Sequence, residues 1–153
     1  MYARILVPID GSATAESGFV EALGLAGRLG SALHLLNVVD ARLLFAEVSA
    51  YTSPQQLLDA WRAAGERLVD SAVKRARAQG LTADGVVRCD PGLRVCDAIV
   101  QEAKESGAEL VVMGTHGRRG LSRVAFGSDA ELVLRESPVP VLLVRGAAPG
   151  DAG

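Results

Sequence analysis

The sequence has few of the residue types that build metal or redox sites. Among its 153 residues there are two cysteines and two histidines. Cys89 and Cys96 are spaced neither as a Cys-x-x-Cys redox pair nor as zinc ligands, and a structural zinc site usually needs four Cys or His side chains. We therefore expect both cysteines to be reduced packing residues, and no metal site built by the protein alone.

The sequence also lacks long apolar runs and a strong charge of either sign. Its longest apolar runs, such as residues 139–144, fall far short of the roughly 20 residues that cross a bilayer. Residues 1–7 lack the basic region, apolar stretch and cleavage site of a signal peptide. The formal net charge of −2 provides no positive field for nucleic acid or anionic lipid. These absences predict a cytoplasmic protein with no nucleic-acid partner and no membrane association.

Apolar residues are abundant enough for one domain core. Hydrophobic residues make up 49% of the chain and charged residues 22%, as in ordinary globular proteins. A chain of 153 residues has room for a single compact domain. We place this domain at residues 1–146 and expect residues 147–153, which are mostly small residues and helix breakers, to form a flexible C-terminal tail.

Short apolar runs alternate along the chain with stretches of helical periodicity, bounded by turn and cap signals. The expected strands cover residues 4–9, 32–39, a segment around 86–87, 109–113 and 139–144. The expected helices run from Ser12 to Gly30, from Ser53 to Gly80, from Val95 to Gly107 and from Ser128 to Glu136. Residues 40–53 form a long connection of open role. This alternation predicts an α/β fold, a single doubly wound five-stranded parallel sheet with helices on both faces.

The Gly-rich segment from Gly114 to Ser128 leaves the fourth strand and enters the last helix. Glycines allow backbone N–H groups to approach an anion, and a helix N-terminus adds free N–H donors and a positive dipole end. Arg118 can supply further positive charge. From spacing alone, a simple turn beside a solvated arginine cluster is an equally good interpretation. The segment is neither a P-loop nor a Gly-x-Gly-x-x-Gly motif.

The spacing of Gly114, Gly117 and Gly127-Ser128 resembles the Gly-x2-Gly-x9-Gly-Ser/Thr signature of ATP-binding universal stress proteins. The likeness extends to the opening residues 5–12 and the closing residues 137–144, and so covers nearly the whole chain. It implies a Rossmann-like, adenine-nucleotide-binding domain whose ligand is ATP, with any Mg²⁺ held mainly by phosphate oxygens and water. The positions that the resemblance assigns to the nucleotide site are Pro8, Asp10, Val38, Met113, Gly114, Gly117, Arg118, Gly127, Ser128 and Asp129.

Several of these positions have a simpler structural interpretation. Asp10 could accept hydrogen bonds in its own turn, and Val38 could be a plain core residue. Two residues depart from the family pattern. Cys89 stands where many nucleotide-binding members have glycine, which predicts a narrower nucleoside pocket. Asp129 would repel a triphosphate if its side chain faced the ligand.

The resemblance predicts that the chain acts in stress response or signalling through a nucleotide-bound dimer. The apolar run 139–144 is expected at a sheet edge, where it would pair with its own copy in a homodimer. Two alternatives remain open: a dimeric adaptor that binds no nucleotide, and a weak ATP hydrolase using His116. No pair of carboxylates in the Gly-rich segment indicates catalysis, and we expect at most slow hydrolysis.

Overall fold

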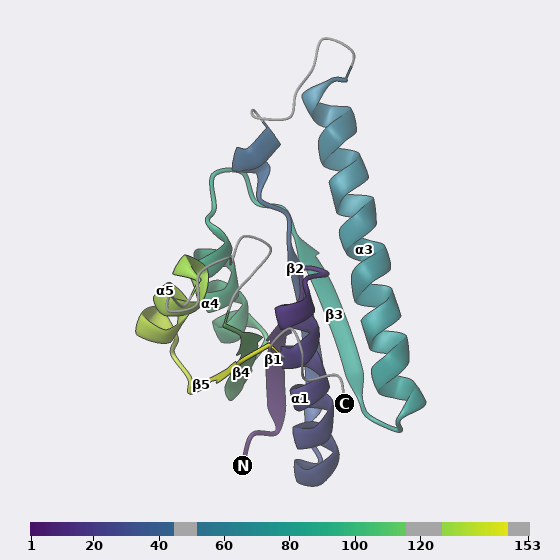
Figure 1. Ribbon diagram of the computed structural model, residues 1–153, viewed down its shortest axis with the longest axis vertical. Coiled ribbons are helices and arrows are strands. Elements are labelled where there is room, and N and C mark those ends of the chain that lie inside the picture. The colour runs from purple at the N-terminus through teal and green to yellow at the C-terminus, as the bar shows by residue number, and fades with distance from the viewer. Residues whose placement is uncertain (45–51, 116–126, 147–153) are drawn as a thin grey trace.

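Five parallel strands and their connecting helices make up the computed structural model, which describes residues 1–44, 52–115 and 127–146 (Figure 1). In chain order the elements are β1 (Arg4–Pro8), α1 (Ala13–Leu29), β2 (Ala32–Val38), the short 3₁₀ helix η1 (Ala41–Leu43), α3 (Pro54–Ala78), β3 (Ala83–Arg88), α4 (Val95–Glu105), β4 (Leu110–Gly114), α5 (Ser128–Glu136) and β5 (Val141–Val144).

The strand order is β3-β2-β1-β4-β5, and every pairing is parallel. The chain first winds outward from β1 through β2 to β3, then crosses to the other side of β1 to form β4 and β5. The predicted doubly wound α/β sheet is therefore confirmed. Its strand order reverses at β1 and β4, and the carboxyl ends of these two strands are where such a sheet binds ligands.

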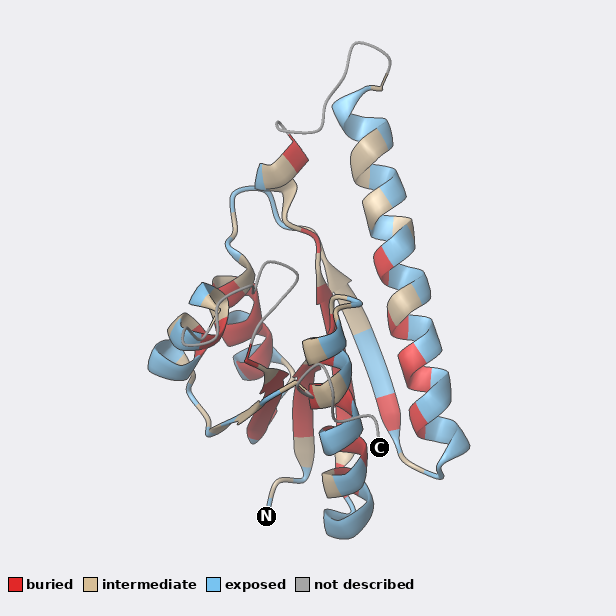
Figure 2. Ribbon diagram, viewed as in Figure 1, coloured by how far each residue is buried: buried red, intermediate tan, exposed pale blue. Residues whose placement is uncertain are grey.

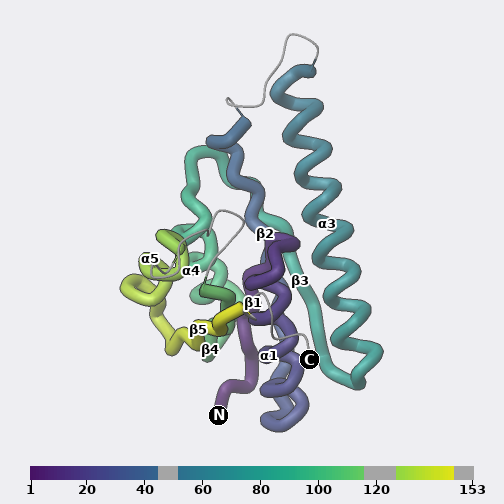
Figure 3. The backbone as a smooth tube through the Cα atoms, in the orientation of Figure 1, coloured from purple at the N-terminus to yellow at the C-terminus, as the bar shows by residue number. Residues whose placement is uncertain are grey.

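Two hydrophobic layers cover the two faces of the sheet (Figures 1 and 3). One layer joins Phe19 of α1 and Ala72 of α3 to the β1 side chains Ile5 and Val7. The other joins α4 and α5 to Leu6, Val111 and other strand residues whose side chains alternate with the first set. The central strands β1, β2 and β4 are consequently buried on both sides, as Figure 2 shows in red, whereas the edge strands β3 and β5 are mostly exposed or of intermediate burial. This explains why the sequence has near-continuous apolar runs rather than an alternating pattern.

The helices begin in two different ways. Ser12 and Ser53 cap α1 and α3, each accepting a hydrogen bond from a backbone N–H in the first turn, and Gln56 completes a capping box at α3. The residues before α4 and α5, Arg94 and Gly127, make no side-chain cap. The first turn of each of these two helices therefore has backbone donors that its cap residue leaves unsatisfied.

The fifth strand is shorter than the sequence predicts. It begins at Val141 rather than Val139, because Pro140 has no N–H to donate to the ladder, although its carbonyl accepts a hydrogen bond from Val111. The predicted edge position of this strand is confirmed by the sheet order. Within the described ranges, no helix is long and apolar enough to cross a membrane. The expected C-terminal tail at 147–153 lies outside the described residues.

Candidate functional site

The carboxyl ends of β1, β2 and β4 bring most of the predicted site residues to one edge of the sheet. Pro8 is the last residue of β1, and Val38 is the last residue of β2. Met113 and Gly114 end β4, with Met113 buried in the α4/α5 layer. The structure thus brings these residues to the point where the strand order reverses, as expected for a ligand site in a doubly wound sheet.

Asp10 lies in the turn between β1 and α1. Its Oδ1 accepts a hydrogen bond from the backbone N–H of Ser12 at 2.9 Å, so one oxygen has the structural role that the sequence left open. The described part of the chain gives Oδ2 no hydrogen-bond partner. Asp10 can therefore stabilise its turn and still offer an acceptor to a ligand.

Asn37 fixes the end of β1 beside the end of β2, a role that the sequence analysis missed. Its Nδ2 donates to the Ile9 carbonyl at 2.8 Å, and the residue is only 8% exposed. Gly65 of α3 leaves the room this side chain needs, because a Cβ there would collide with Asn37 Oδ1. The available signal was an amide within an otherwise apolar strand, since a buried amide needs hydrogen-bond partners.

Gly114 has a packing role that is independent of any ligand. A Cβ at this position would collide with the carbonyl of Thr14 and would lie 3.0 Å from the backbone nitrogen of Ala15. Gly18, one turn further along α1, approaches Gly114 in the same way, since its own Cβ would lie 2.9 Å from the Gly114 nitrogen. The first two turns of α1 therefore pack backbone against backbone on the end of β4.

Thr115 and Gly127 join the two ends of the Gly-rich segment. The Gly127 N–H donates to the Thr115 carbonyl at 2.7 Å, and the Thr115 N–H donates to the Val144 carbonyl of β5 at 3.0 Å. Thr115 is 3% exposed. These bonds place the start of α5 beside the end of β4. The predicted site residues Gly117 and Arg118, like His116, lie outside the described residues.

The first turn of α5 offers backbone donors at this edge of the sheet. The first hydrogen bond within the helix runs from Glu131 to Gly127, so the N–H groups of Ser128, Asp129 and Ala130 precede it. Gly127 makes no side-chain cap. Three N–H groups at the positive end of a helix dipole form an environment suited to an anion. Ser128 is exposed, and its hydroxyl lies at the same helix start.

Asp129 is half-buried near charged groups at η1 and at the start of α4. Burial raises the pKa of its carboxyl, and the nearby charge of Asp40 adds to that rise. The backbone N–H of Cys96 in the first turn of α4 works in the opposite direction, as do the guanidinium groups of Arg42 and Arg94. The start of α4 is thus a neighbour of Asp129 that sequence spacing does not reveal.

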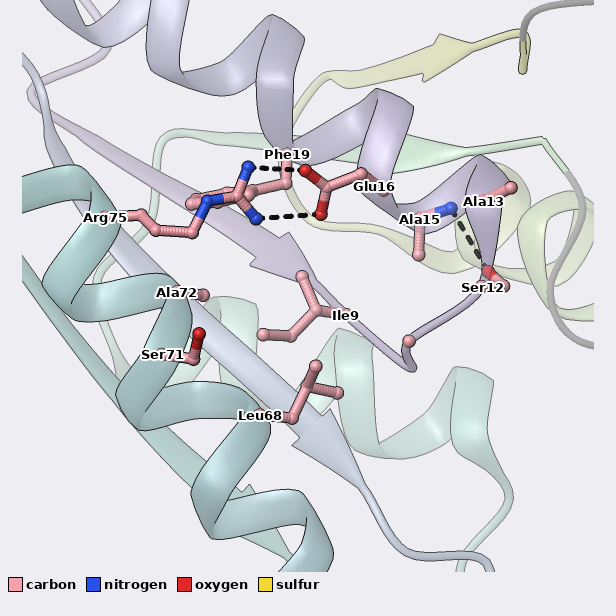
Figure 4. Close-up of a pocket in the computed structure, with 11 residues that line it drawn as sticks. Ile9, Ser12, Ala13, Ala15, Glu16, Phe19, Leu68, Ser71, Ala72 and Arg75 are labelled. Atoms are coloured by element: carbon pink, nitrogen blue, oxygen red, sulfur yellow. Dashed lines mark hydrogen bonds and ion pairs between the residues drawn. The ribbon is translucent and has the colours of Figure 1, made fainter.

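A pocket of about 420 Å³ lies between α1, α3 and the β1–α1 turn (Figure 4). Ile9 and Phe19 form part of its apolar wall, and both belong to the α1/α3 layer. Arg75 lies over the Phe19 ring, 4.8 Å from its centroid, and forms a two-pronged ion pair with Glu16. None of the predicted nucleotide residues lines this pocket. Ile9, Gly11 and Ser12 line it, so the pocket adjoins the β1–α1 turn that holds Asp10 and opens between α1 and α3.

Cys89 lies just beyond β3, the edge strand farthest from β4. It is half-exposed and lines a second, polar pocket of about 540 Å³ with Arg88 and Asp90 of the same segment and Glu66 of α3. Cys96 is buried under α4, and burial raises the pKa of its thiol. A buried, protonated thiol agrees with the predicted packing role for this cysteine.

The fold and the arrangement of this edge define a class: doubly wound α/β proteins with a candidate ligand site at the reversal of strand order. Comparison with known proteins then narrows the class to one family. The family model described as "Universal stress protein family" matches residues 1–145. The chain belongs to the universal stress protein family.

Individual relatives match this chain over nearly its full length. A protein of Staphylococcus epidermidis named as a universal stress protein is 31% identical over 148 residues, covering 94% of this chain and 84% of the relative. A crystal structure of a universal stress protein family member from Burkholderia pseudomallei has 33% identity and a TM-score of 0.77. The match covers 95% of this chain and 97% of the chain in that structure. The Archaeoglobus fulgidus universal stress protein in complex with dAMP shares the fold, with 22% identity and a TM-score of 0.64. This match covers 93% of this chain and 97% of that one.

Proposed function

We propose that this chain binds an adenine nucleotide, ATP, at the edge formed by the carboxyl ends of β1, β2 and β4 and the start of α5. The observation that carries the proposal is the first turn of α5, whose donors precede the first helical hydrogen bond and whose cap residue has no side chain to satisfy them. Membership of a family whose Archaeoglobus fulgidus member was crystallised with dAMP supports an adenine nucleotide as the ligand.

The proposed pose assigns the base, the sugar and the phosphates to different parts of this edge. Val38 and Met113 provide apolar surface for the base from the ends of β2 and β4. Asp10 Oδ2 provides an acceptor for the sugar at the end of β1, while Ser128 and the α5 first turn meet the phosphates. Gly117 and Arg118 are proposed to complete the phosphate site. The described residues hold no group of three His, Cys, Asp or Glu that could bind a metal ion. Any Mg²⁺ is proposed to be held by phosphate oxygens and water.

The proposed role is stress response or signalling by a nucleotide-bound homodimer. Support for the dimer comes from β5, an edge strand whose Leu142 is 38% exposed. An apolar edge strand tends to pair, and pairing with its own copy closes the assembly. An adaptor that binds no nucleotide is the outcome that would replace this proposal.

Calorimetry of ATP binding tests the nucleotide proposal. The protein is stripped of ligand by unfolding and refolding, and ATP is titrated into the wild type and into Gly127→Glu. Gly127 has φ −52°, which any residue adopts, so the new side chain fits the backbone while placing a carboxylate at the start of α5. We expect wild-type binding with a Kd in the millimolar range or below, and no binding by Gly127→Glu.

The matched control is Gly24→Glu, the same substitution on the exposed side of α1, where a new Cβ meets nothing within 4 Å. This variant should bind ATP like the wild type. Circular dichroism confirms that all three proteins are folded. A folded wild type that binds no ATP would overturn the proposal, and equal binding by Gly127→Glu would move the site away from α5.

A further inference from the structure

Asn37 and Val38 are neighbours in β2, and their side chains lie on opposite faces of the sheet. Val38, which we assign to the base, packs with the α4/α5 layer. Asn37 points the other way, toward Gly65 of α3, and is 8% exposed. It is therefore not placed to contact a nucleotide that lies against Val38, and it can act on this site only through the residues that it holds.

Asn37 holds the peptide unit that joins Ile9 to Asp10. Its Nδ2 donates to the Ile9 carbonyl at 2.8 Å, while the Ile9 N–H donates to the Leu36 carbonyl at 2.8 Å. Because the peptide unit is planar, the bond from Asn37 also orients the backbone nitrogen of Asp10. Asp10 Oδ1 accepts the Ser12 N–H at 2.9 Å. Asp10 is thus held on both sides along the chain, and these two bonds determine where its Oδ2 points.

Gly65 gives the Asn37 amide the room that it needs. A Cβ at position 65 would collide with Asn37 Oδ1 and would lie 3.2 Å from both Asn37 Cγ and Val87 Cγ1. Val87 is the partner of Asn37 in the β2–β3 ladder. A methyl group at position 65 would therefore push the amide away from the Ile9 carbonyl. The close approach of α3 to β2 is compatible with the Asn37 bond only because position 65 is glycine.

We propose that Asn37 is a positioning residue for the nucleotide site, and that Gly65 is the α3 residue that allows it to act. The inference rests on the proposed nucleotide function. Through the Ile9–Asp10 peptide unit, this pair sets how well Asp10 Oδ2 meets the sugar, and so it sets the affinity of the site. The affinity at one face of the sheet then depends on how α3 packs on the other face.

Two substitutions test the inference at different ends of the contact. Asn37→Leu removes the donor with little change in size, and Gly65→Ala displaces the amide without altering β2. Calorimetry measures the Kd values of ATP and AMP for each variant. We expect both variants to bind both nucleotides about tenfold more weakly than the wild type, the scale of a lost hydrogen bond to a charged group. The loss should be equal for ATP and AMP, because it arises at the sugar and not at the phosphates.

A double-mutant cycle shows whether the effect passes through Asp10. Asp10→Ala removes the acceptor that Asn37 is proposed to position. In that background, Asn37→Leu should weaken ATP binding by less than about twofold, because residues that act through one contact have non-additive effects. A full tenfold loss on top of Asp10→Ala would overturn the inference.

Val73→Ala is the control for a purely structural loss. Val73 is buried in the α1/α3 layer, about two turns further along α3 than Gly65, so its truncation destabilises the fold at a distance from Ile9. Its Kd for ATP should stay within about twofold of the wild-type value. The ¹³C chemical shift of the Ile9 carbonyl, measured without nucleotide, should move in Asn37→Leu and Gly65→Ala and stay in place in Val73→Ala.

The outcomes separate this inference from the proposed function. If Val73→Ala loses as much ATP affinity as Asn37→Leu, or if the Ile9 carbonyl shift moves while the affinity does not, the positioning role is wrong and nucleotide binding stands. A folded wild type that binds neither ATP nor AMP contradicts the proposed function, and the inference fails with it.

Discussion

His34 ties β2 to its neighbours through both nitrogens of its ring. Nε2 lies 2.7 Å from Glu102 Oε1 in α4, and Nδ1 contacts Asp84 Oδ1 in β3. Arg4 of β1 donates to both oxygens of Asp84 at 2.9 Å, while Arg88 holds the second oxygen of Glu102 at 3.0 Å. This network links three strands and a helix around a largely buried imidazole.

Replacing His34 with Leu should destabilise the fold without moving the nucleotide site. The substitution leaves the buried Glu102 carboxylate with Arg88 alone, and we expect the free energy of unfolding to fall by about 2–3 kcal/mol. Urea denaturation at pH 7 measures the loss. His34→Gln, which retains one donor, should recover part of it. An unchanged midpoint in His34→Leu would show that the network contributes no stability.

Asp129 should oppose folding at neutral pH. Its pKa is raised by burial, so the folded state binds a proton more tightly than the unfolded state does, and the ionised carboxylate is a cost above the folded pKa. Asp129→Asn should therefore increase the free energy of unfolding at pH 7.5 by roughly 0.5 kcal/mol. This value is at the upper end of the usual range for substitutions outside the core. The gain should disappear as the pH falls through the folded pKa of Asp129.

The neighbouring Asp97 should have the opposite effect on the stability of the fold. Its hydrogen bonds to Arg94 lower its pKa, so the ionised form stabilises the fold above the unfolded pKa and this contribution is lost in acid. Asp97→Asn should reduce stability at pH 7.5 and make no difference at pH 2. Urea denaturation across this pH range compares the two variants, and a stabilising Asp97→Asn would contradict the assigned pairing.

At the scale of elements, the glycines of the signature have two different roles. Gly114 lies where α1 approaches β4 too closely for a Cβ, whereas Gly127 has an ordinary backbone conformation at the start of α5. The sequence pattern treats both as phosphate-binding positions. The structure adds a packing requirement at Gly114 that would persist if the protein bound nothing.

Alanine substitutions should separate these roles. Gly114→Ala is expected to lower the free energy of unfolding by about 1–3 kcal/mol, because the new methyl group forces α1 away from β4. Gly127→Ala should change it by less than about 0.5 kcal/mol. Guanidinium denaturation of both variants measures the difference. Equal stability losses would show that the close α1/β4 contact is not what requires glycine at position 114.

The sequence predicted the elements well where their signals are local. Apolar runs marked the strands, and Ser12 and Ser53 marked the starts of α1 and α3, because a cap acts within one turn. It placed the start of β5 too early, since the apolar run includes Pro140, which cannot donate to a ladder. The family signature also located the edge of the sheet at which most of the candidate residues meet.

Contacts between distant parts of the chain could not be predicted from the sequence. The bond from Asn37 to Ile9 spans 28 positions. The approach of Asp129 to Cys96 likewise depends on how α4 and α5 pack, and the collision at Gly114 on how α1 lies over β4. No periodicity or motif contains such information, because it arises only when the layers assemble.

At the scale of the whole molecule, the proposed dimer depends on the exposed edge of β5. Leu142→Lys places a charge on that edge and should prevent strand pairing, since charged side chains protect edges from association. Light scattering after size-exclusion chromatography should give a mass near twice the 15.9 kDa of one chain for the wild type, and near 15.9 kDa for the variant. Val20→Lys, at a 53% exposed position on α1, should remain dimeric.

The most direct test of the central claim is to locate the bound nucleotide by NMR. Amide chemical shifts of the 15.9 kDa chain are followed as ATP is added. We predict that the largest changes occur at Asp10, Val38 and Ser128. Changes concentrated at Ser71 and Arg75 would instead place ATP in the pocket between α1 and α3 and contradict the assignment of the site.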